Sequence, residues 1–173
     1  MKIISDIFGV LGVLITVVLY QQKTRKSLLI FKLTNDLVWL VHYAFIGAYS
    51  GAAVCVIAAV RELVFVKSDP KNKKAKIWLP IFIIVAIIST VLTWNNAFST
   101  LTCLASCLAV TSFFIGNPSL TRILVFPISA CMLTYDIACS SFAGIINECF
   151  AISSSLIGVL FIDRKKKSLF DTQ

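Results

Sequence analysis

Residues 77–94 read IWLPIFIIVAIISTVLTW, and this stretch is apolar on every face of a helix. An uncharged run of this length is typical of a helix that crosses a bilayer. The rest of the chain is similar, since 58% of its 173 residues are hydrophobic, 14% are charged and the mean hydropathy is +0.92. An ordinary soluble domain is far more polar. We therefore predict an all-α integral membrane protein and exclude a soluble enzyme, a nucleic-acid-binding module and a disordered regulator.

Six further apolar runs flank this stretch, with turn-forming residues between them. The first run lies where a signal peptide would lie. However, Asp6 interrupts its start, and a basic segment at residues 21–26 follows it in place of a small-residue cleavage site. We expect this run to remain as a transmembrane helix. The sequence thus predicts seven spans, at residues 7–20, 28–46, 51–66, 77–94, 98–115, 120–140 and 144–162.

The basic residues between the predicted spans indicate the orientation. Groups of three, five, one and four cations follow the first, third, fifth and seventh spans, and they include thirteen of the 16 Lys and Arg residues. All four groups share one side only if the chain crosses seven times, because six crossings would place the last group opposite the first. Cytoplasmic loops are rich in Lys and Arg. We predict an N-terminus outside, a C-terminus inside and a cytoplasmic face that contacts anionic lipid.

The order of the spans also indicates an internal repeat. A displacement of 93 residues aligns residues 31–51 with 124–144 and brings Gly51 onto Gly144. Two parallel three-helix repeats need one linker span between them, because otherwise the second repeat would insert upside down. We predict a 3+1+3 plan. It has a first triple-helix repeat at residues 1–67, a basic loop and linker helix at 68–97, a second repeat at 98–163 and a basic cytoplasmic tail at 164–173.

The segment QQKTRKSLLIFKLTNDLVWLVHYAFIGAYSGA, residues 21–52, has a histidine followed by a Gly-x-Tyr turn. It resembles the first repeat of the uncharacterised bacterial inner-membrane proteins of the YgjV type, which implies the bacterial cytoplasmic membrane. More distantly, the 3+1+3 plan and the polar corner at residues 21–27 resemble the SWEET and PQ-loop transporters, whose triple-helix repeats surround a solute path. The Pro-Gln pair of those transporters is absent. The SWEET pattern of an aromatic residue on the second helix and an amide on the third is matched in part, by Trp39 and Asn147.

Charged residues within the predicted spans are the main indication of function, since each costs about 2.5–3.5 kcal/mol unless it is paired or hydrated. Lys32 and Asp36 lie one helical turn apart on the second span. Arg61 and Glu62, on the third span, lie at a depth close to that of Asp36. We predict that these four residues form an inner charged cluster. Alternatively, Arg61 forms a structural ion pair with Asp36 or with Glu62 that holds the helices in register.

The second repeat has a different set of polar residues. Asp136 and Glu148 lie nearer the outside, at a depth similar to that of His42. We predict that these three residues form an outer polar cluster, so that each repeat contributes a different gate. His42 is either a pH-sensitive gate or a hydrogen-bonded packing residue. The counterparts of the inner charged cluster in the second repeat are uncharged: Val125, Ser129, Ser154 and Ser155.

These clusters favour a carrier for a small polar solute. The carrier would work by alternating access between two triple-helix bundles, along a path lined by Trp39, Tyr43 and Asn147. Trp39 fits a core position equally well. The alternative is a non-transporting membrane subunit or sensor whose polar residues serve assembly, and it predicts mutually paired charges and no aqueous path.

The sequence gives little support for an enzyme. No Gly-x-Ser-x-Gly, His-Glu-x-x-His or P-loop pattern occurs in it. Cys103 and Cys107 lie one turn apart, but no Cys-x-x-Cys pair occurs and the single histidine, His42, is distant in sequence. We expect no enzymatic activity, no cofactor, no metal and no nucleic-acid partner. The cysteines are predicted to be small buried hydrophobic residues: Cys55, Cys103, Cys107, Cys131, Cys139 and Cys149.

Overall fold

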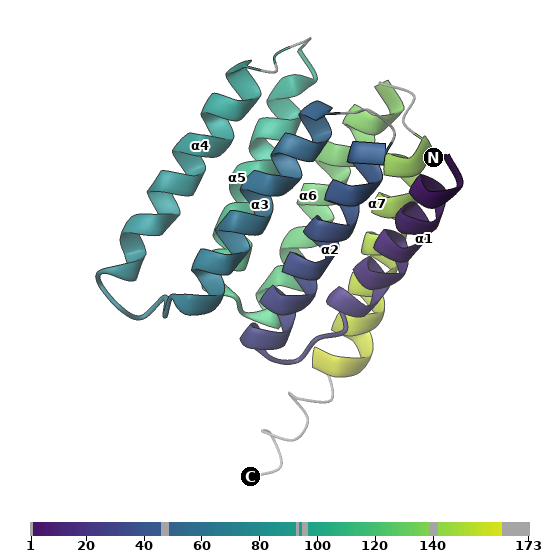
Figure 1. Ribbon diagram of the computed structural model, residues 1–173. Coiled ribbons are helices and arrows are strands. Elements are labelled where there is room, and N and C mark those ends of the chain that lie inside the picture. The colour runs from purple at the N-terminus through teal and green to yellow at the C-terminus, as the bar shows by residue number, and fades with distance from the viewer. Residues whose placement is uncertain (1, 46–48, 93, 95–96, 139–141, 164–173) are drawn as a thin grey trace.

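The computed structural model describes residues 2–45, 49–92, 94, 97–138 and 142–163, and seven α-helices lie within them (Figure 1). The predicted spans correspond to these helices one by one, with boundaries that agree within five residues. Cys139 and the predicted tail at residues 164–173 lie outside the described residues. A 3₁₀ turn, Ala75–Ile77, leads into α4, and a π-helical turn, Gly158–Asp163, continues α7. The helices are α1 (Lys2–Leu19), α2 (Arg25–Phe45), α3 (Tyr49–Lys67), α4 (Trp78–Leu92), α5 (Ser99–Ile115), α6 (Pro118–Ala138) and α7 (Phe142–Ile157).

The turn between α5 and α6 illustrates how the sequence sets the helix ends. α5 is followed by Gly116, whose φ of 61° is the left-handed conformation that glycine adopts readily and whose N–H donates to the Ser112 carbonyl oxygen at 2.9 Å. Asn117 Oδ1 accepts a hydrogen bond from the Ser119 N–H at 3.1 Å. Pro118 takes the first position of α6, where no N–H is needed. The Gly-Asn-Pro sequence therefore ends one helix and begins the next within two residues.

The helices form two layers of three, with α4 at one edge (Figure 1). α2 packs between α1 and α3, and α6 packs between α5 and α7. The layers meet where α1 contacts α7 and where α3 contacts α5, while α4 packs mainly on α5. Successive helices run in opposite directions, so α1, α3, α5 and α7 end where α2, α4 and α6 begin. The basic segments 23–26 and 67–76 lie at that end, which we call the basic end.

The surface of the bundle is apolar and its interior contains many polar side chains. Large hydrophobic side chains such as Val10, Leu14, Ile84 and Ile88 are exposed. Among the described residues, almost as many polar as apolar residues are buried. A soluble protein shows the reverse distribution. The arrangement fits a chain whose surrounding solvent is lipid, because polar groups then gain by lying inside the bundle.

Four helical stretches of the described chain are long and apolar enough to cross a membrane. They are Arg25–Phe45, Ala75–Leu92, Pro118–Ala138 and Gly144–Asp163. Two shorter apolar stretches, Ile4–Leu19 and Ser99–Ile115, belong to α1 and α5. α3 contains three charged residues within its 19 positions, Arg61, Glu62 and Lys67. The structure thus establishes an all-helical protein with several apolar helices.

The apolar core lies toward the basic end. The Phe65 ring near the end of α3 is fully buried, and it meets the rings of Phe82 and Phe114 edge to face, with centroids 5.3 Å apart in both pairs. Leu19 at the end of α1 and Leu28 at the start of α2 belong to the same cluster. Aromatic pairs of this geometry stabilise a core by about 0.5–1.5 kcal/mol each beyond the area that they bury.

Candidate functional site

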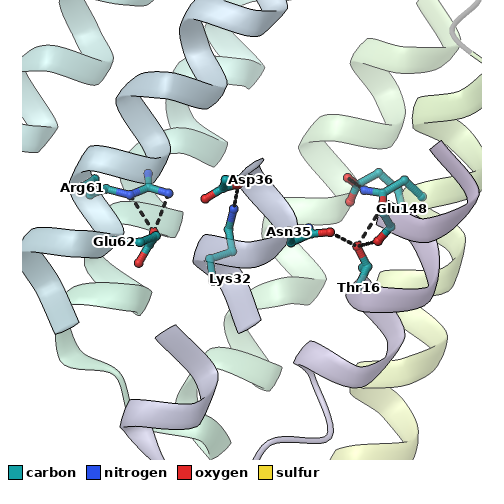
Figure 2. A network of polar contacts seen from close by, with 9 residues as sticks. Thr16, Lys32, Asn35, Asp36, Arg61, Glu62 and Glu148 are labelled. Carbon is teal, nitrogen blue, oxygen red and sulfur yellow. Dashed lines mark hydrogen bonds and ion pairs between the residues drawn. The ribbon is translucent and has the colours of Figure 1, made fainter. Parts of the chain in front are cut away.

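The centre of the bundle holds a polar network that joins α1, α2 and α7 (Figure 2). The Thr16 hydroxyl oxygen lies 3.0 Å from the Gly12 carbonyl oxygen, 3.2 Å from Asn147 Oδ1 and 3.4 Å from Asn35 Oδ1. A hydroxyl has one proton, so it donates to one of these three acceptors at a time. Asn147 donates through Nδ2 to Glu148 Oε1 at 3.3 Å, which orients its amide with the oxygen toward Thr16. Three acceptors therefore compete for the single proton of Thr16.

Lys32 and Asp36 form an ion pair along α2, as their spacing of one helical turn predicts. The ammonium group of Lys32 also lies 5.6 Å from the centroid of the Phe113 ring, within the range of a cation–π contact. The second carboxylate oxygen of Asp36 is buried and has no hydrogen-bond partner among the described residues. Asp36 thus retains an unused acceptor inside the bundle.

A second ion pair lies beside the first one (Figure 2). Arg61 contacts Glu62 Oε1 through Nε at 2.9 Å and through Nη2 at 2.8 Å. The Glu62 side chain is fully buried, and its Oε2 has no partner within the described chain. Lys32 and Asp36 are close enough to act electrostatically on Glu62. The four members of the predicted inner charged cluster thus lie near one another, and the ion pair of Arg61 is with Glu62.

Two cavities meet at the polar network. The larger has a volume of about 350 Å³ and is lined by Lys32, Asn35, Asp36, Trp39, Tyr43, Val54, Cys55, Gly144, Asn147 and Glu148. The smaller, of about 150 Å³, extends to Leu19, Tyr20 and Thr121 near the basic end. Both are lined by the same four polar residues: Lys32, Asn35, Asn147 and Glu148. Asn35 lies ten residues into α2, about 15 Å along its axis, so the shared residues are near the middle of the bundle.

All three residues of the predicted path line the larger cavity. Trp39 and Tyr43 lie one turn apart on α2, and their ring centroids are 5.8 Å apart. Asn147 reaches the cavity from α7, on the facing layer. The cavity therefore combines two aromatic rings with amide and charged groups.

The three residues of the predicted outer polar cluster have different surroundings. The His42 Nδ1 atom lies 2.8 Å from the Ser5 carbonyl oxygen and 3.0 Å from the Ser5 hydroxyl oxygen on α1. Glu148 lies in the central network and also forms a hydrogen bond with Ser129 of α6. Asp136 is buried beside Gly144 and close enough to Glu148 for an electrostatic effect. The structure thus brings Asp136 toward Glu148, while the contacts of His42 are with α1 and with neighbouring aromatic rings.

Arg122 has a structural role that its place among the basic residues between the predicted spans does not indicate. The Arg122 side chain is buried at the basic end and donates through Nε to the Tyr20 carbonyl oxygen at 2.6 Å and through Nη2 to the Gln22 carbonyl oxygen. Its Nη1 contacts Asp163 Oδ1 at 2.6 Å. The available signal is its position, because Arg122 lies two residues inside the predicted span at 120–140 and not in the loop.

Arg25 makes the corresponding contacts on the other layer. It lies at the start of α2, as Arg122 lies near the start of α6, and its Nη2 donates to the carbonyl oxygens of Phe65 at 2.8 Å and Phe114 at 3.3 Å. Each arginine thus joins the third helix of its own layer to the first helix of the facing layer. Carbonyl groups at helix ends lack partners within the helix, and cations are favoured there. We call the contacts of Arg25 and Arg122 the arginine contacts.

Apolar helices around a buried polar network and two cavities define the chain as a multi-pass membrane protein with a polar interior. Its sequence matches the family Imp-YgjV, described as bacterial inner membrane protein, over residues 3–166. The chain belongs to this family and is a protein of the bacterial inner membrane. This confirms the resemblance drawn from residues 21–52. No curated protein and no solved structure matches the chain, so the likeness to SWEET and PQ-loop transporters stays a prediction.

Proposed function

We propose that this protein is a carrier that moves a small polar solute across the bacterial inner membrane by alternating access. The observation that supports it best is the pair of cavities that share Lys32, Asn35, Asn147 and Glu148 near the middle of the bundle. A solute held there has one cavity toward each end of the molecule. Transporters commonly place the substrate site near the bilayer midplane, between two structural repeats.

In this proposal all seven helices cross the membrane, in a 3+1+3 plan with the N-terminus outside. The positive-inside rule supports placing the basic end in the cytoplasm. The helix contacts support two repeats, because α1 contacts α7 and α3 contacts α5, as expected for two triplets related by a two-fold axis along the bundle. α4 lies at the edge and packs mainly on α5, which suits a linker.

In the proposed mechanism, the bundle is open at one end and closed at the other. The larger cavity extends toward Tyr43 and Gly144, away from the basic end. The basic end is closed by the apolar core, by the arginine contacts and by Gln21, whose Nε2 donates to the Ser154 carbonyl oxygen at 2.7 Å. This arrangement corresponds to a state that receives solute from outside. Release into the cytoplasm requires the contacts at the basic end to separate while the outer half of the cavity closes.

Cysteine accessibility tests the path directly. In a full-length variant without the native cysteines, Asn147→Cys places a thiol on the cavity wall, while Ile146→Cys places one on the outer surface, where Ile146 is 51% exposed. A charged, membrane-impermeant thiol reagent added from outside needs water to reach its target. We expect it to modify Asn147→Cys much faster than Ile146→Cys, which would face lipid. Equal, negligible rates at both positions would favour the non-transporting subunit, whose polar groups pair with one another as Arg61 and Glu62 do.

Transport itself requires a flux measurement. Solutes that raise the melting temperature of the purified protein would be tested by counterflow in proteoliposomes, with protein-free liposomes as the control. We expect exchange of at least one stabilising solute. Binding without exchange for every such solute would contradict the carrier and support a sensor.

A further inference from the structure

We propose that the solute held in the larger cavity is a small organic cation with an ammonium group. This inference rests on the proposed function and concerns the substrate class of the same site.

The charges that line the cavity are the first argument. Two carboxylates, Asp36 and Glu148, face a single cation, Lys32. Arg61 does not compensate for this excess, because it is paired with Glu62. An unbalanced carboxylate within a membrane is costly, so a ligand that brings a positive charge gains from its neutralisation. An anionic ligand would add to the imbalance.

The hydrogen bonds of the network give an independent argument. The second carboxylate oxygen of Asp36 is buried without a partner, and the Asp36 residue is only 6% exposed. Asn35 Oδ1 and Asn147 Oδ1 compete with a backbone carbonyl for the one proton of Thr16. Asp36 Oδ2 and the oxygens that compete for the Thr16 proton can therefore accept further hydrogen bonds, and an ammonium group supplies three donors and no acceptor. Each hydroxyl of a sugar or diol brings one donor together with two acceptor lone pairs, so it suits these oxygens less well.

The aromatic lining agrees with the same ligand. Trp39 and Tyr43 both line the cavity, and the faces of tryptophan and tyrosine rings attract cations through their quadrupole. The indole ring of Trp39 lies against Gly12 of α1, where an added Cβ would lie 2.9 Å from Nε1. The volume of about 350 Å³ is at the lower limit of ligand cavities, which suits a small amine.

Matched ligands test the substrate class. The melting temperature of the full-length protein in detergent would be measured with ethanolamine against ethane-1,2-diol, and with 1,4-diaminobutane against butane-1,4-diol, while glycolate and succinate provide the anions. We expect a saturable rise in melting temperature with at least one amine and none with its matched diol or with either anion. No rise with either amine, or an equal rise with the matched diol, would overturn the proposal.

Single-residue variants test whether the amine binds in the larger cavity. Glu148→Gln keeps the shape of the side chain and removes its charge, and we expect it to weaken amine binding about tenfold or more. Asp6→Asn removes an exposed acid on α1 and should leave binding unchanged. Amine binding by Glu148→Gln equal to that of the wild type would contradict the site. If Glu148→Gln does not purify as a folded protein, Tyr43→Leu provides the test. We expect Tyr43→Leu to weaken amine binding. An unchanged affinity for the amine would contradict the site.

The two proposals fail in different ways. A neutral solute that stabilises the protein and exchanges in proteoliposomes would leave the carrier intact and reject the organic cation. An amine that binds but never exchanges would keep the ligand class and reject the carrier. An unreactive Asn147→Cys together with no stabilising solute would reject both.

Discussion

Replacement of Arg122 by methionine tests the arginine contacts. Methionine keeps part of the apolar packing but removes the contacts to Tyr20, Gln22 and Asp163. A hydrogen bond to a charged group contributes about 1.5–3 kcal/mol, and breaking a buried ion pair by removing one partner costs about 3–5 kcal/mol. Asp163 is partly exposed and keeps a bond from the Ser119 hydroxyl at 2.7 Å, which reduces the loss. We expect a net destabilisation of about 3–5 kcal/mol.

The assay is thermal unfolding in detergent, with Lys26→Met as the matched control. Lys26 is an exposed cation at the same end of the bundle, and its replacement should change stability by less than about 0.5 kcal/mol. With roughly 2–4 °C per kcal/mol for a chain of this size, Arg122→Met should melt roughly 6–20 °C below the wild type. A melting temperature within about 2 °C of the Lys26→Met control would refute the reasoning, because the buried contacts would then contribute no more than an exposed lysine.

Three further predictions follow from the same contacts and from the proposed topology. Arg61→Met should destabilise the protein by about 3–5 kcal/mol, and addition of Glu62→Gln should recover part of the loss; a double variant less stable than the single one would argue against the pair. Gly158→Ala should destabilise the protein, because a Cβ there would lie 2.6 Å from Arg122 Cδ, and the effect should be smaller in an Arg122→Met background; full additivity would exclude this contact as the cause. In a variant without the native cysteines, a Lys73→Cys thiol should react with an impermeant reagent only when the cytoplasmic face is accessible, and labelling from outside would reverse the orientation.

The helices were predictable because lipid-facing runs are apolar over the thickness of a bilayer. Residues 77–94 and 98–115 contain no charged residue, and they correspond to α4 and α5 within two residues at each end. The predicted start of the first span, residue 7, lies five residues after the start of α1. Asp6 interrupts the apolar run, but an acidic side chain on the exposed surface near a helix end does not break the helix. Hydropathy indicates which stretches of the chain face lipid, and this is enough to locate the helices.

Residue contacts across the bundle were less predictable. The Lys32–Asp36 pair follows from spacing along one helix, so the sequence predicts it. The contact of His42 with Ser5 and that of Arg122 with Tyr20 depend on how α1 is rotated against α2 and α6. Nothing in a single sequence fixes that rotation, because several faces of a membrane helix are equally apolar. Depth alone grouped His42 with Glu148, although the two side chains come from different helices and have different contacts.

The atoms that accept hydrogen bonds in the arginine contacts determine how easily the basic end can open. Most of the acceptors are backbone carbonyl oxygens at helix ends, such as those of Tyr20 and Phe65, and only Asp163 is a carboxylate. Removal of an arginine leaves these carbonyls buried and unsatisfied, which is why the substitution is costly. Separation of the intact partners is different, because water that enters at the basic end replaces each lost hydrogen bond and the net cost of each is only about 0.5–1.5 kcal/mol. Contacts of this kind hold the basic end closed in the absence of a trigger and still permit the opening that the proposed carrier requires.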